Sequence, residues 1–178
     1  HTLSLHDALP ISGYSRNADG NHDMVVWRYN ADGSLDTSFG SGGFFVHGNA
    51  AGGDDYDMAN GITIDSNERI LVTGYSSNIS GNYDMVVWRC NPDGTLDTSF
   101  DDDGYAVQGI ATGGHLHDEG HDIGIDRGGK IVVAGYRETD ANVHDMALWR
   151  FNSDGSLDTT FGGSGYVVHR SAAGADGF

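Results

Sequence analysis

Residues 84–89 read DMVVWR, and the architecture of the whole chain can be worked out from this stretch. The same six letters stand at residues 23–28, and residues 145–150 read DMALWR, so the motif recurs at a constant spacing of 61 residues. A fixed period of this length is typical of proteins that stack one small structural unit on the next. The register continues without a gap from Gly13 to the end of the chain, which predicts a repeat protein.

Each period contains four segments typical of β-strands. In the central copy these are residues 59–65, 69–75, 84–90 and 104–108. The first two are joined by Ser-Asn-Glu, and the following copy has Arg-Gly-Gly at this place; both are typical of a hairpin turn. Because the runs ILVTG and MVVW are apolar on both faces, we expect these strands to lie between two other sheets. Four antiparallel strands per period, stacked face to face, predict the blades of a β-propeller.

The chain holds too few periods for a closed propeller, which uses roughly 4–8 blades. We therefore predict an all-β fold, a β-propeller fragment of about two and a half four-stranded antiparallel blades, with an open solenoid of stacked sheets as the alternative. The first residues, HTLSLHDALPIS, resemble the translation of a sequencing adapter, so we expect a non-native leader in place of the authentic N-terminus. The expected divisions are residues 1–12 for this leader, 13–55 for a partial blade with strands three and four, 56–116 and 117–170 for complete blades, and 171–178 for the truncated start of another repeat.

The composition agrees with many short strands joined by tight turns. The 178 residues include 28 glycines, and only three of the 26 acidic residues are glutamate, whereas helical proteins draw their charge from Glu, Lys and Arg. A formal net charge of −17 argues against nucleic-acid partners, and no apolar run approaches the ~20 residues of a membrane span. The single cysteine, Cys90, excludes an internal disulfide and a cysteine-based metal site, and we expect it to fill a core position.

The turn that follows each tryptophan-arginine pair carries the most specific pattern of the chain. It reads NADGSLDTSFG from Asn30, NPDGTLDTSFD from Asn91 and NSDGSLDTTFG from Asn152. With its period near sixty, this pattern resembles the bacterial delta-60 repeat over nearly all of residues 13–170. The resemblance implies a propeller-forming repeat of large, exported bacterial proteins, and it implies no established activity and no catalytic residues.

Four residue types recur once per period in a fixed phase. They are Trp27, Trp88 and Trp149; Phe39, Phe100 and Phe161; Arg28, Arg89 and Arg150; and Asp36, Asp97 and Asp158. We expect the aromatic residues to fill the core between sheets rather than to stack on a ligand. Each arginine precedes its aspartate by eight residues, so we expect an ion pair that fixes the long turn to its strand. A ring of arginines that binds an acidic ligand is the alternative.

The Asn-x-Asp-Gly turns invite comparison with the calcium loop of the EF-hand, and they do not fit it. If Gly33 is placed at the glycine of that loop, Arg28 takes the first ligand position and Phe39 the last. We expect local hydrogen bonds from the Asn and Asp side chains to hold these turns. Weak calcium binding by an acidic cluster, such as Asp101, Asp102 and Asp103, stays open.

Residues 115–122, HLHDEGHD, depart most from the repeat. Imidazole and carboxylate groups together can hold a transition metal, so His115, His117, His121 and Asp118 are weak candidates for a zinc site. A solvated loop is the competing interpretation, because no spacing typical of a metal site is present. We therefore expect no cofactor.

The sequence has no Gly-x-Ser-x-Gly elbow, phosphate-binding loop, zinc-protease helix or dinucleotide fingerprint. We expect a non-enzymatic propeller segment of an exported bacterial protein, extracellular or on the cell surface, that serves as a structural or adhesive scaffold. Its expected partners are further repeats of the same full-length protein, and a protein or glycan, with no nucleic acid and no membrane insertion. Two alternatives stay open: a glycan- or metal-binding propeller that uses the loop face around residues 115–122, and a fragment of a propeller hydrolase or lyase.

Overall fold

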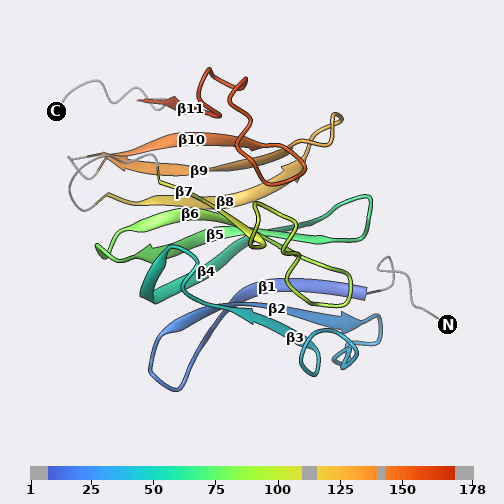
Figure 1. Ribbon diagram of the computed structural model, residues 1–178. Helices are drawn as coiled ribbons and strands as arrows, with labels where there is room; N and C mark the ends of the chain where they lie inside the picture. Colours follow the sequence, from blue (N-terminus) through green and yellow to red (C-terminus); the bar gives the residue numbers. More distant parts are fainter. Residues whose placement is uncertain (1–7, 110–115, 140–142, 171–178) are drawn as a thin grey trace.

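The computed structural model of the chain describes residues 8–109, 116–139 and 143–170. The described residues fold into strands and turns, and none of them forms a helix able to cross a membrane. Three sheets lie one above the other, with the first sheet at one end of the stack and the third at the other (Figure 1). The strands are β1 (Ala8–Arg16), β2 (His22–Asn30) and β3 (Phe44–His47) in the first sheet; β4 (Gly52–Ile64), β5 (Ile70–Asn78), β6 (Tyr83–Cys90) and β7 (Tyr105–Gln108) in the second; and β8 (Asp118–Ile125), β9 (Ile131–Thr139), β10 (Val143–Phe151) and β11 (Tyr166–His169) in the third.

Each sheet is an antiparallel meander in chain order. The second sheet pairs β4 with β5, β5 with β6 and β6 with β7, and the third repeats this order from β8 to β11. A single parallel pair, His22 with Tyr56, links the strands of the first and second sheets, so that by backbone pairing they form one seven-stranded sheet. The predicted all-β, propeller-type fold with four-stranded antiparallel units is thus confirmed, and the three sheets do not close into a ring.

The first sheet has three strands, whereas the sequence predicted strands three and four alone. Residues 8–12, expected to belong to a foreign leader, form the start of β1 and pair with β2 from Asn30 to Val26. The reason is a match of pattern: Leu9 and Ile11 occupy the repeat positions of the strand-forming Ile70 and Val72. β1 lies at the edge of its sheet, where a residue without an N–H such as Pro10 is tolerated. The origin of residues 1–12 and the blade divisions stay predictions.

Two buried clusters fill the spaces between the sheets. Strand β6 shows why both faces of a sheet are apolar: Val86, Trp88 and Cys90 point toward the first sheet, while Met85 and Val87 point toward the third. Trp88 and Trp149 are fully buried in the two clusters. Trp27 occupies the same repeat position but is partly exposed, because it lies on the outward face of the first sheet.

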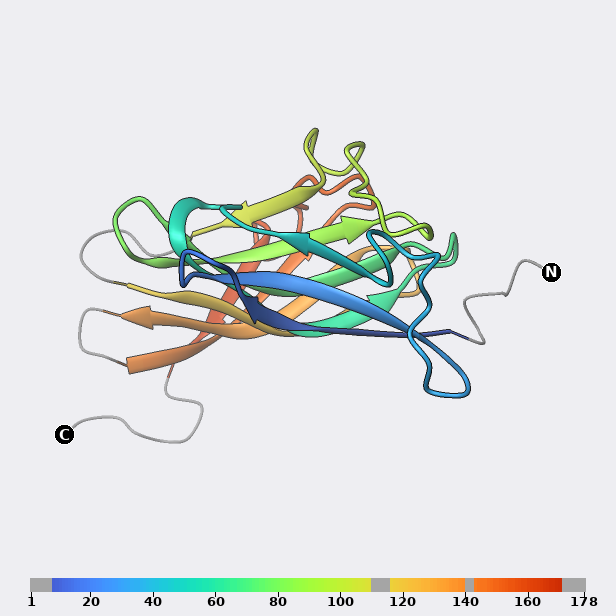
Figure 2. The same ribbon diagram turned by 90° about the horizontal axis from the view of Figure 1, so that it is seen from below.

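Most strands of the three sheets lie along roughly the same axis and alternate in direction, so the loops gather at two opposite ends (Figure 2). One end carries the β4–β5 and β8–β9 hairpins. The other carries the connections between the second and third strands of each sheet. The side chains at these two ends differ in kind.

The second strand of the second and third sheets carries a glycine, Gly74 or Gly135, that close backbone contact explains. The ladder between β4 and β5 slips by one residue between Ala59 and Gly61, which pushes the β4 backbone toward Gly74. A Cβ atom at Gly74 would overlap the carbonyl oxygen of Met58. In the first sheet, which lacks this neighbouring strand, a Cβ at Gly13 would lie 3.4 Å from the Trp27 ring, an ordinary contact distance.

We therefore expect Gly74→Ala and Gly13→Ala to differ although the two glycines share one repeat position. Gly74→Ala should lower the free energy of unfolding by about 1–3 kcal/mol or more, because the added methyl group displaces backbone. Gly13→Ala should change it by no more than about 0.5 kcal/mol. Urea unfolding followed by tryptophan fluorescence measures both values. Equal losses for the two variants would contradict the close approach of β4.

Candidate functional site

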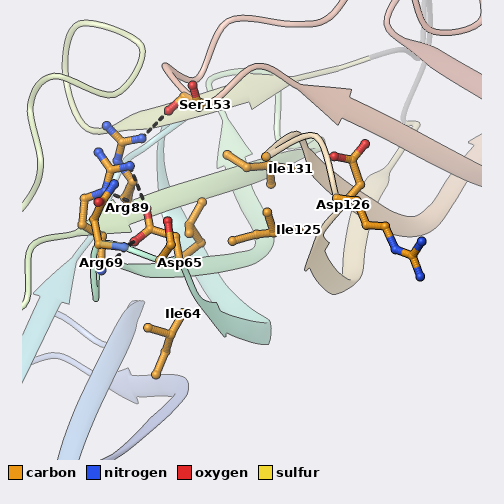
Figure 3. Close-up of a pocket in the computed structure, with 13 residues that line it drawn as sticks. Ile64, Asp65, Arg69, Arg89, Ile125, Asp126, Ile131 and Ser153 are labelled. Carbon is orange, nitrogen blue, oxygen red and sulfur yellow. Dashed lines mark hydrogen bonds and ion pairs between the residues drawn. The ribbon is translucent and has the colours of Figure 1, made fainter. Parts of the chain in front are cut away.

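A cleft opens between the second and third sheets, where the β4–β5 hairpin faces the β8–β9 hairpin. Its volume is about 410 Å³, and the same repeat positions line it from both sides, because Ile64 and Asp65 of one hairpin correspond to Ile125 and Asp126 of the other. Figure 3 shows Ile125 and Ile131 between Arg69 and Arg89 on one side and Asp126 on the other, with Ile64 below them. The cleft thus combines an apolar middle with charged margins.

The hairpins that form the cleft are shaped by their own aspartates. Asp65 Oδ1 accepts hydrogen bonds from the backbone N–H groups of Asn67 (2.8 Å) and Arg69 (2.9 Å). In the next copy Asp126 Oδ1 accepts from Gly128 (2.7 Å) and Lys130 (3.0 Å) in the same way. Such an aspartate stabilises the turn before any ligand is present.

Arg89 forms the buried floor of one side of the cleft. Its Nε donates to Asp97 Oδ2 at 2.7 Å, its guanidinium lies 4.5 Å from the centre of the Phe100 ring, and its Nη1 donates to the carbonyl oxygen of Ser153 in the third sheet. Burial lowers the pKa of Arg89, and the nearby charge of Arg69 acts in the same direction, while Asp97 opposes both. Arg89 is thus a structural residue that joins two sheets and whose donors point at protein acceptors.

Arg69 lies nearer to the solvent and bridges two carboxylates. Its Nη2 is 2.7 Å from Asp65 Oδ2, and its Nη1 is 3.5 Å from Asp97 Oδ2. A guanidinium has five N–H donors in a rigid plane, more than these two aspartates use. Because Arg69 borders the cleft, its further donors can reach a ligand there.

All three predicted arginine-aspartate couples are brought together. Arg28 Nε lies 2.8 Å from Asp36 Oδ2, Arg89 Nε lies 2.7 Å from Asp97 Oδ2, and Arg150 Nε lies 2.9 Å from Asp158 Oδ2. Each contact uses a single carboxylate oxygen. The other oxygen accepts from the hydroxyl group two residues later, which for the three copies belongs to Ser38, Ser99 and Thr160.

The repeated phenylalanines and Cys90 lie as the repeat pattern suggests. Phe39 and Phe100 are fully buried, and each lies under the guanidinium of the arginine in its own sheet. Phe161 lies under Arg150 at 4.6 Å but is less covered, since it belongs to the third sheet. Burial raises the pKa of the Cys90 thiol to about 12, which keeps the group protonated and unreactive at neutral pH.

The histidines lie at the opposite end of the strands from the cleft. The backbone N–H of Tyr83 donates to Nδ1 of His117 (3.0 Å), and the two rings lie 4.3 Å apart. His121 lies 5.4 Å from Tyr136, with its Nε2 3.9 Å from Glu119. His117 therefore packs against Tyr83, and His121 packs against Tyr136, whose ring stacks on His144. His115 lies outside the described residues.

Within residues 8–109, 116–139 and 143–170, no group of three or more His, Cys, Asp or Glu side chains converges as metal ligands would. Asp118 is fully buried at the start of β8. Asp101, Asp102 and Asp103 are exposed in the turn before β7. Burial raises the pKa of Asp101, and the neighbouring carboxylates Asp103 and Asp102 add to this effect. Zinc or calcium binding stays untested.

The sequence reasoning missed Asp65, Arg69, Ile64 and Ile125, although it located both hairpins. A signal was present: an aspartate is followed four residues later by a basic residue in both copies, Asp65 by Arg69 and Asp126 by Lys130. The sequence analysis assigned Ile64, Asp65 and Arg69 to the strands of a hairpin and gave them no role in binding. They line a cleft because two sheets pack against each other, and a local sequence pattern does not predict this packing.

The arginine-aspartate couples predict acid sensitivity. The pKa of Asp158 is lowered to about 2, chiefly because the Thr160 hydroxyl donates to it, with Lys130 and Arg150 adding their charge. An unfolded aspartate titrates near pH ~3.9. Because the folded value is the lower one, the stability that Asp158 contributes is complete above pH ~4 and is lost as the pH falls toward about 2.

Asp158→Asn should therefore lower the thermal midpoint at pH 6, and the difference from the parent should vanish as the pH approaches 2. The exposed carboxylate of Asp19 offers a control, because Asp19→Asn removes the same charge without breaking such a couple. Thermal unfolding followed by circular dichroism between pH 2 and 6 gives the comparison. A difference that stays constant with pH would show that the Asp158 carboxylate adds no stability.

Comparison with known proteins supports the fold and shows the family of the chain. Among solved structures, the chain is similar to a fucose lectin from Kordia zhangzhouensis in complex with methyl-fucoside, with 14% sequence identity and a TM-score of 0.50 over 92% of this chain and 91% of the lectin chain. This likeness concerns the fold. No curated protein matches the chain, and the resemblance to the delta-60 repeat stays a prediction. A family model matches residues 11–39, 66–100 and 129–161, which places the chain in the family described as a domain of unknown function (DUF5122) beta-propeller.

Proposed function

We propose that this chain is a non-enzymatic binding segment of a β-propeller, and that the cleft between its second and third sheets binds a sugar-sized polar ligand. The observation that carries the proposal is the cleft itself, with a volume of about 410 Å³ at the lower end of the range of small-molecule sites. The proposed ligand needs no metal or other cofactor.

The lining suits a molecule with an apolar face and a polar edge, as a sugar ring has. Ile64 and Ile125 offer apolar surface from two sheets, and Ile64 is 38% exposed. Arg69, Asp65 and Asp126 supply donors and acceptors at the margins. Since these charged groups are already held by hydrogen bonds within the hairpins, a ligand would meet a preorganised surface and would pay little to order it.

A binding role also agrees with how the carboxylates of the cleft are engaged. Asp65 accepts from two backbone N–H groups with Oδ1 and from the Arg69 guanidinium with Oδ2. A general base needs a free lone pair directed at its substrate. The lectin of similar fold, whose structure contains methyl-fucoside, supports the choice of a glycoside as the first ligand class to test.

This proposal combines the scaffold and the glycan-binding interpretations of the sequence. It places the binding site at the hairpin end of the strands, whereas the sequence analysis considered the loop face around residues 115–122. An exported or cell-surface location is part of the proposal. It rests on the acidic, lysine-poor composition, with 26 acidic residues and a formal net charge of −17.

The proposal is tested by titrating the chain with methyl-fucoside, methyl-galactoside and methyl-glucoside up to about 10 mM, followed by NMR or calorimetry. We expect saturable one-to-one binding of at least one glycoside. Arg69→Ala should weaken it by about tenfold or more, because a hydrogen bond to a charged group contributes ~1.5–3 kcal/mol. Because the Arg69–Asp65 ion pair is partly buried, with side-chain exposures of 23% and 12%, circular dichroism must show that Arg69→Ala keeps its strands.

Lys130→Ala is the matched control. Lys130 has the repeat position of Arg69 but lies on the third sheet and is not part of the cleft lining. It should bind the glycoside as the parent does. The proposal fails if no glycoside saturates the chain, or if Arg69→Ala and Lys130→Ala bind with equal affinity.

A further inference from the structure

Positive charges gather around the cleft between the second and third sheets. The sequence has nine Lys and Arg residues against 26 Asp and Glu. Three of the nine, Arg69, Arg89 and Arg127, line the cleft, whereas two of the 26 acidic residues do, Asp65 and Asp126. The lining thus departs from the charge balance of the whole chain, which bears on the kind of ligand that the cleft selects.

Both carboxylates of the lining are engaged by their own hairpins. Asp65 Oδ2 lies 2.7 Å from Nε and 2.7 Å from Nη2 of Arg69. Asp126 Oδ1 accepts hydrogen bonds from two backbone N–H groups of its turn. Because donors directed at a carboxylate stabilise its negative charge, these two groups oppose an anionic ligand less than free carboxylates would.

Arg89 contributes positive charge to the cleft while its nitrogens serve the fold. Nε donates to Asp97 Oδ2, Nη1 to the carbonyl oxygen of Ser153, and Nη2 to Ser99 Oγ at 3.3 Å. The side chain is 2% exposed. Arg89 therefore acts on a ligand through its charge rather than through direct hydrogen bonds.

Arg127 differs from the other two arginines of the lining. It lies in the turn between β8 and β9 and is exposed. Its guanidinium has no hydrogen-bond or ion-pair partner among residues 8–109, 116–139 and 143–170. A guanidinium presents five N–H donors in a rigid fork that matches a carboxylate, so Arg127 is suited to hold such a group by two parallel hydrogen bonds.

The two hairpins of the cleft differ at this position. Ser66 of the β4–β5 hairpin has the repeat position of Arg127, and both residues line the cleft. One hairpin thus offers a neutral hydroxyl group where the other offers a guanidinium. Ile125 and Ile131 lie between Arg69 on one side and Asp126, the chain neighbour of Arg127, on the other (Figure 3). A fitting ligand therefore has an apolar middle and one anionic group at one end.

We infer that the cleft selects a sugar that carries a carboxylate, a hexuronide, and that Arg127 binds this carboxylate. The inference rests on the function proposed above and names the class of glycoside. The sugar ring would lie on the isoleucine side chains, with its hydroxyl groups toward Arg69 and Ser66. A ligand with denser negative charge would also meet Asp65 and Asp126, and the net charge of −17 would repel it more strongly.

The inference is tested by titrating the whole chain with methyl-glucuronide and methyl-galacturonide, and with the methyl ester of each. The ester keeps the ring and the size of the sugar but removes its charge. Calorimetry or NMR at pH 7 measures the affinities. We expect at least one hexuronide to bind about tenfold or more tightly than its ester, because a hydrogen bond to a charged group is worth more than one between neutral groups.

Arg127→Ala should abolish this preference, so that the ratio of the two affinities falls to about one. Arg16→Ala is the matched control, because it removes the same charge from an exposed arginine at the end of β1, outside the cleft lining. It should keep the ratio of the parent. Circular dichroism checks that both variants keep their strands.

The outcomes separate this inference from the function on which it rests. If neutral glycosides bind and the hexuronides bind no more tightly than their esters, the inference is overturned and the proposed function stands. The inference is also overturned if Arg127→Ala keeps the preference, or if Arg16→Ala loses it equally, since the preference would then reflect the overall charge. If neither neutral glycosides nor hexuronides saturate the chain, the proposed function fails together with the inference.

Discussion

Every sheet of this protein is apolar on both faces, and this constraint governs the rest of the structure. Strand β6 directs its residues alternately into two different cores, so the second sheet is stable only between two others. The extent of burial follows directly from the position in the stack. Trp88 and Trp149 are fully buried, whereas Trp27, in the same phase of the repeat, is partly exposed at the end of the stack. The hydrophobic contribution to the free energy of unfolding therefore depends on the number of stacked sheets, as in other repeat proteins in which each unit contacts only its neighbours.

Polar contacts give this stack its register. One arginine per period binds its own aspartate and covers its own phenylalanine, as Arg89 does with Asp97 and Phe100. Arg28 and Arg89 also donate to a carbonyl of the next sheet, that of Pro92 and that of Ser153. Apolar burial is non-directional and would tolerate sliding of one sheet over another. A planar guanidinium that is held by contacts on three sides prevents such sliding. The arginine thus converts a sequence period into a fixed displacement between sheets, and the cleft beside Arg89 exists because that displacement is fixed.

Most of the fold could be predicted from the sequence, because its information is local and repeated. The strands expected at residues 69–75 and 84–90 correspond to β5 and β6, since apolar runs and turn residues determine them locally. The number of strands in the first sheet could not be predicted, because residues 8–12 match the repeat in pattern but not in letters. The cleft was missed for a different reason. Ile64 and Ile125 are 61 residues apart, and they line one space only because two sheets face each other.

Comparison of the periods separates the positions required for stacking from the hairpin positions beside the proposed binding cleft. The tryptophan, the arginine and the aspartate eight residues after it are identical in all three copies, as stacking requires. The hairpin that borders the cleft varies: Arg69 becomes Lys130, and Glu68, which has a positive φ of 63°, becomes Gly129 with a φ of 76°. The turn shape is thus kept while the side chains presented to the cleft change. A cleft built from two successive hairpins combines two such sets of side chains, so a stack of these sheets can form a series of clefts that share one geometry and differ in their lining.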